Sequence, residues 1–91
     1  MKTNSRARSG YDLIARCIRP ERTYPGDPDA YVVERQIPVW ALVGHWRAAG
    51  RDAKLTASEF QVKPDTVEAA IAYYRLHRDL IDARLAANQP A

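Results

Sequence analysis

Histidine and cysteine are the side chains here that could do chemistry, and their spacing argues against it. His45 and His77 stand far apart in the sequence, and Cys17 has no Cys or His neighbour at the spacing of a zinc site. No nucleophile with a paired base and no glycine-rich phosphate loop accompanies them. We therefore expect no catalytic residue, no metal site and no cofactor, and we expect that the chain is not an enzyme.

Positive charge gathers in the first quarter of the chain. Residues 1–24 hold six Lys or Arg against two acidic residues, a net charge of +4 in a chain whose total is +3. Residues 1–10 show no hydrophobic period and are expected to form a flexible basic arm. Lys2, Arg6 and Arg8 are predicted to contact DNA phosphates, because each neutralised phosphate releases counterions. The alternative is a solvated tail that binds nothing.

The segment from Ala57 to Val67 has the spacing of a helix-turn-helix. Ala57 offers the small side chain that two crossing helices need, and Gln61 falls at the turn. Val62 follows as an apolar plug and Val67 as a buried β-branched residue. These offsets predict that a second helix packs across the first.

The outward face of that second helix supplies the other predicted DNA contacts, Lys63 and Thr66. Asp65 and Glu68 lie on the same face and make it negative overall, which opposes the approach of phosphates. A helical unit of this kind that only binds proteins or dimerises is therefore the alternative interpretation.

Hydrophobic periodicity and turn residues predict the elements that position these residues. Two short strands precede three helices, and a loop rich in proline and glycine separates the strands. The expected segments are a strand at 11–18, a loop at 20–30, a strand or small hairpin from 31 through 34–36 to 39, and helices at 38–50, 53–60 and 64–88.

Trp46 completes an apolar stripe on the first of these helices. Val39, Leu42, Val43 and Trp46 recur at the spacing of one helical face. Trp40 lies about a quarter-turn away from this stripe. It is expected to pack in the core, or alternatively to cover the β element or a second subunit, and its truncation is expected to cost less than that of Trp46.

The third helix carries two apolar stripes on nearly opposite sides. The stripe of Val67 and Ile71 is expected to face the first helix. The other stripe is expected to stay uncovered and to form a homodimer or a complex with a partner protein. Its predicted interface residues are Ala69, Tyr73, Leu76, Leu80 and Ala83. In the alternative, the helix breaks near His77 and Arg78, and Leu80 folds back into the core.

Three segments together resemble the bacterial family known as domain of unknown function 433. They are Arg35-Gln36-Ile37-Pro38-Val39-Trp40 with the helix that follows, the alanine-rich run from Val67 to Tyr73-Tyr74, and Gly26-Asp27-Pro28. The resemblance covers about residues 12–88. It implies a small β element followed by a winged or homeodomain-like helical unit, among VapB-like antitoxins. It also implies a partner, a PIN-like ribonuclease toxin.

The sequence as a whole predicts a mainly α protein with a short N-terminal β element and a three-helix, helix-turn-helix-like bundle, in a single domain over residues 11–91. The content of 46% hydrophobic and 27% charged residues is that of a folded chain. The longest uncharged apolar run, residues 37–44, is too short to span a membrane. The single cysteine indicates a reducing, cytoplasmic compartment.

The expected function is that of the antitoxin in a type II toxin–antitoxin pair. The chain would occlude its toxin by direct contact and repress its own operon through operator DNA. The alternative is a non-enzymatic, dimeric protein-interaction module that does not bind DNA.

Overall fold

The computed structural model describes residues 9–88. Helical structure makes up 65% of these residues. Within residues 9–88 the fold has five α-helices beside a small three-stranded sheet. In chain order the elements are α1 (Gly10–Cys17), β1 (Ile18–Arg19), β2 (Tyr31–Val32), the 3₁₀ helix η2 (Glu34–Gln36), β3 (Ile37–Pro38), α2 (Val39–Ala48), α3 (Ala53–Phe60), α4 (Pro64–Leu76) and α5 (Arg78–Ala87). The mainly helical class is thus confirmed, as are the helices predicted at 38–50 and 53–60.

The strand predicted at 11–18 is wrong, because most of this segment is the helix α1. Ser9 caps its amino end, where the Ser9 hydroxyl accepts a hydrogen bond from the Asp12 backbone N–H at 3.1 Å. Only Ile18 and Arg19 are extended. The β element is therefore preceded by a helix, and Gly10, predicted to lie in the flexible arm, is the first residue of α1.

The sheet is antiparallel in the order β1-β2-β3, with Ile18 opposite Val32 and Val32 opposite Ile37. The predicted loop at 20–30 and the predicted turn at 34–36 are both confirmed. The turn places Arg35 and Gln36 at φ values of 61° and 53°, in the left-handed region that favours glycine.

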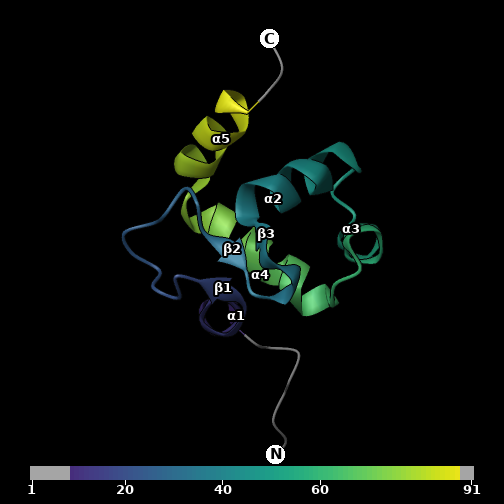
Figure 1. The fold of residues 1–91 in the computed structure, drawn as a ribbon, viewed down its shortest axis with the longest axis horizontal. Coiled ribbons are helices and arrows are strands. Elements are labelled where there is room, and N and C mark those ends of the chain that lie inside the picture. The colour runs from purple at the N-terminus through teal and green to yellow at the C-terminus, as the bar shows by residue number, and fades with distance from the viewer. Residues whose placement is uncertain (1–8, 89–91) are drawn as a thin grey trace, which may run out of the picture.

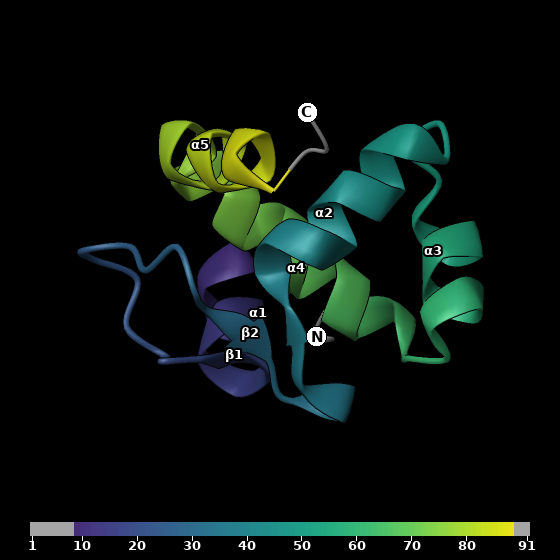
Figure 2. The same ribbon diagram turned by 45° about the horizontal axis from the view of Figure 1, so that its top comes forward.

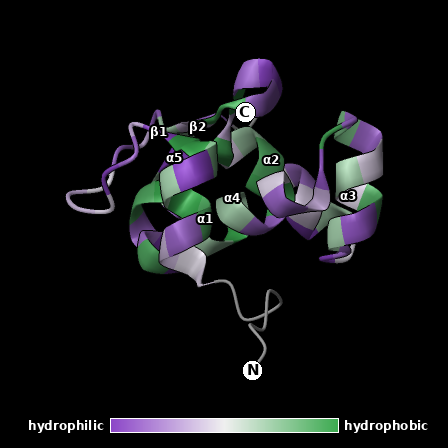
Figure 3. Ribbon diagram, turned by 90° about the horizontal axis from the view of Figure 1, so that it is seen from below, coloured by the Kyte–Doolittle hydropathy of each residue, from purple (hydrophilic) through white to green (hydrophobic). Residues whose placement is uncertain are grey.

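Helix α4 lies at the centre of the molecule, with α1 on one side and α2 and α3 on the other (Figures 1 and 2). The predicted stripe of α2 is confirmed, because Val39, Leu42, Val43 and Trp46 are all buried. Trp40 is only half-buried. Helix α1 carries both hydrophobic and hydrophilic residues (Figure 3), and its Ile14 is completely buried in the shared core.

The prediction of one continuous helix over 64–88 is wrong, because the helix is interrupted at His77, whose backbone is not helical (φ −131°, ψ 46°). The loop before β2 packs against this break. The His77 Nε2 atom lies 2.6 Å from the Thr23 carbonyl oxygen, and the Tyr73 hydroxyl accepts a hydrogen bond from the Asp27 backbone N–H at 2.7 Å. A Cβ atom on Gly26 would lie 2.5 Å from the His77 ring, so glycine permits this close approach.

Helix α5 turns back from the break and packs against α2. Leu85 packs so closely against Gly44 that a Cβ atom there would lie 2.8 Å from it. The alternative prediction of a break near His77 is thus confirmed, although the fully buried residue is Ile81, while Leu80 is only half-buried.

Candidate nucleic-acid interface

Helices α3 and α4 meet at the turn that the helix-turn-helix spacing predicts. Ala57, Val62 and Val67 are 3%, 8% and 0% exposed, as their offsets require. Gln61 adopts a left-handed conformation (φ 59°, ψ 47°), and the Val62 N–H donates to the Ala57 carbonyl at 3.0 Å. This conformation explains why glycine is favoured at such a turn, although glutamine occupies it here.

The two predicted DNA contacts on α4 have different environments. Lys63 is exposed, whereas Thr66 is only 4% exposed and points inward. The Thr66 hydroxyl donates a hydrogen bond of 2.7 Å to the Glu34 carboxylate. The prediction that Thr66 points outward is therefore wrong, because a carboxylate from η2 engages its hydroxyl.

Glu34 closes the amino end of α4, a role that local sequence patterns do not predict. Its Oε1 atom also accepts the Lys63 backbone N–H at 3.0 Å, so one carboxylate satisfies both donors. The hydrogen bonds from Thr66 and from the Lys63 backbone lower the pKa of Glu34 from its ordinary value. A negative charge therefore lies at the helix end that would otherwise attract phosphates.

We predict that Glu34→Ala lowers the free energy of unfolding by about 1 kcal/mol at pH 7, as loss of a helix cap does. A lowered folded-state pKa means that the charged cap stabilises above the unfolded-state pKa and loses this effect as pH falls through the folded-state pKa. The difference between wild type and variant should narrow below about pH 4.5. Urea melts at pH 7 and pH 4 measure it, with Glu68→Ala on the same helix as control. Equal stability of wild type and Glu34→Ala at pH 7 would contradict the role.

Acidic and basic groups alternate around the same helix end. A cleft of about 390 Å³ there is lined by residues that include Arg16, Glu34, Lys63 and Asp65. Arg16 of α1 pairs with Asp65 of α4 at 3.6 Å. A phosphate approaching α4 from this side would therefore meet two carboxylates.

Two of the five residues of the predicted partner interface are covered by the chain itself. Ala69 and Tyr73 are both 0% exposed, because α1 and the loop at 20–30 cover the side of α4 that was expected to stay open. Leu76 and Leu80 are half-buried and Ala83 is exposed. The interface prediction is therefore wrong at Ala69 and Tyr73, and it stays a prediction at the other three residues.

The remaining candidate residues have ordinary structural contacts. His45 pairs with Glu59 beside the Phe60 ring, and His77 holds the loop at 20–30. Among residues 9–88 no three His, Cys, Asp or Glu side chains gather as a metal site would need, and no helix has the length and apolar character to cross a membrane. Lys2, Arg6 and Arg8 lie outside the described residues.

Comparison with known proteins adds no relative: no family model, no curated protein and no solved structure matches this chain.

Proposed function

We propose that this chain is the antitoxin of a type II toxin–antitoxin pair, which occludes a PIN-like ribonuclease by direct contact and represses its own operon by binding DNA. It acts without chemistry of its own. The toxin half of the proposal rests on the resemblance described above. We also propose that the chain acts in the cytoplasm and forms a homodimer.

The α3–turn–α4 unit carries the DNA half of the proposal. The burial of Ala57, Val62 and Val67 and the left-handed Gln61 are what a helix-turn-helix requires at these offsets. The net charge of +3, with its concentration in residues 1–24, supports binding to a polyanion.

A second candidate is a protein-interaction module that does not bind DNA. The observation that favours it is the occupied surface of α4, because α1 covers one side and Glu34 caps the amino end. Little of α4 is then free to read bases in a groove.

Fluorescence anisotropy with the chain's own promoter separates the two candidates. Full-length protein is titrated into labelled promoter DNA and into a scrambled duplex of equal length, each at two salt concentrations. We expect tighter binding to the promoter and weaker binding at higher salt, with a flatter salt dependence after deletion of residues 1–8. Equal or absent binding to the two duplexes would contradict repression and favour the interaction module.

A further inference from the structure

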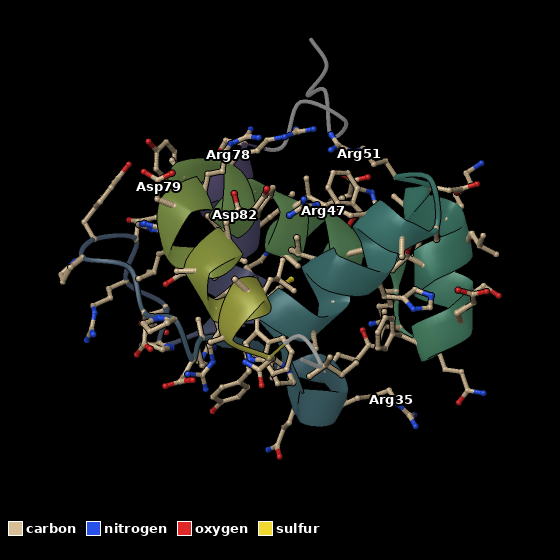
Figure 4. The ribbon with its side chains drawn as sticks, turned by 90° about the horizontal axis from the view of Figure 1, so that it is seen from above. Arg35, Arg47, Arg51, Arg78, Asp79 and Asp82 are labelled. Carbon is tan, nitrogen blue, oxygen red and sulfur yellow. The ribbon has the colours of Figure 1, made fainter. Side chains whose placement is uncertain are left out.

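Three arginines on one edge of the molecule are supported from below by buried aromatic rings. Arg47 lies at the end of α2, Arg51 in the loop that follows it, and Arg78 at the start of α5, and all three are exposed. Figure 4 shows them along the same edge, with Arg35 on the opposite side. We call Arg47, Arg51 and Arg78 the arginine ledge.

Each guanidinium of the ledge is held over a ring. The Arg51 Cζ atom lies 5.5 Å from the centre of the Trp46 ring, and the Arg47 and Arg78 Cζ atoms lie 6.0 and 5.2 Å from the Tyr74 ring. These distances are within the range of cation–π attraction. Trp46 and Tyr74 are only 6% and 5% exposed, so the ledge presents charged N–H donors to solvent rather than aromatic surface.

Asp82 fixes one end of this arrangement. It accepts hydrogen bonds of 2.9 Å from both Arg47 and the Tyr74 hydroxyl. Burial raises the pKa of Tyr74, which keeps that hydroxyl protonated and able to donate. Arg51 and Arg78 form no ion pair within residues 9–88, so their donors are available to an anion.

We propose that the arginine ledge binds the phosphate backbone of DNA, chiefly through Arg51 and Arg78. This inference rests on the proposed function and names the surface that serves it. Planar guanidiniums held in place suit phosphate oxygens, which need charge and donors but no apolar pocket.

The surroundings of the ledge favour DNA over an acidic protein. The exposed large hydrophobic residues of the described chain, Tyr11, Tyr24, Tyr31, Val33 and Leu55, do not belong to the ledge, whereas protein interfaces usually centre on such anchors. Asp79 and Asp82 lie near Arg78 and Arg47 and reduce the local charge (Figure 4).

The test compares two charge-matched double variants in the anisotropy titration. Arg51→Gln with Arg78→Gln should weaken binding at least tenfold, by the same factor on promoter and scrambled DNA, and should lower the salt slope by about two. The control, Arg35→Gln with Arg84→Gln, removes the same charge outside the ledge and outside the α3–turn–α4 unit, and it also alters one left-handed residue and the Arg84–Asp29 ion pair. It should bind within about twofold of wild type.

Three results would overturn the ledge. In the first, the two double variants lose equal affinity for DNA. In the second, the ledge variant binds DNA like wild type. In the third, the ledge variant keeps its DNA affinity but no longer binds its partner protein, which would make the ledge a protein-binding surface. If circular dichroism shows that the glutamine pair unfolds, the single variants Arg51→Gln and Arg78→Gln replace it, and each should weaken binding and lower the salt slope by about one. Failure of wild type to prefer its promoter would instead overturn the proposed function.

Discussion

Tyr73→Ala is expected to lower the free energy of unfolding by about 3–5 kcal/mol, a large part of the stability of a small domain. The side chain is completely buried between α1 and the loop at 20–30, and its ring lies 4.7 Å from the His77 ring. Truncation would leave a cavity and remove the hydroxyl that holds the Asp27 backbone N–H. Urea melts followed by circular dichroism measure the loss.

Tyr73→Phe is the matched variant for this prediction. It keeps the ring and removes only the hydroxyl, so we expect a loss of about 1–2 kcal/mol from the unpaired Asp27 N–H. If Tyr73→Ala stayed within about 1 kcal/mol of wild type, the loop at 20–30 would not be packed on α4 as described.

Trp46→Ala is expected to cost a similar 3–5 kcal/mol, because Trp46 completes the buried stripe of α2 and is 6% exposed. Trp40, which is half-buried on the same helix, provides the comparison. Trp40→Ala should cost clearly less, since part of its ring already faces solvent and the Arg84 guanidinium. Equal losses in denaturant melts, or a loss under about 0.5 kcal/mol for Trp46→Ala, would show that the assigned face of α2 is wrong.

The sequence predicted α2 and α3 well because their signals are local. The stripe of Val39, Leu42, Val43 and Trp46 and the turn at Gly50 lie within one helical segment and its end. Helix α1 also has a local signal in the sequence, since Ser9 and Asp12 have the spacing of a capping box. The alternation of residues over 11–18 favoured a strand instead, so the helix that covers Ala69 and Tyr73 was not predicted.

The break at His77 and the cap by Glu34 depend on contacts between distant residues. His77 meets Thr23, and Glu34 meets Thr66, across the whole fold. No glycine or proline marks position 77, so periodicity alone favoured one continuous helix there. The arginine ledge was missed for the same reason, because Arg51 and Arg78 share one edge of the molecule only through the packing of α4 and α5 against α2.

Growth on co-expression with the neighbouring reading frame tests the antitoxin proposal most directly. We expect that this frame encodes a small ribonuclease that arrests growth when expressed alone. Co-expression of this chain should restore growth, and the two proteins should co-purify as one complex. A neighbouring product that is not toxic, or whose toxicity this chain leaves unchanged, would contradict the antitoxin proposal.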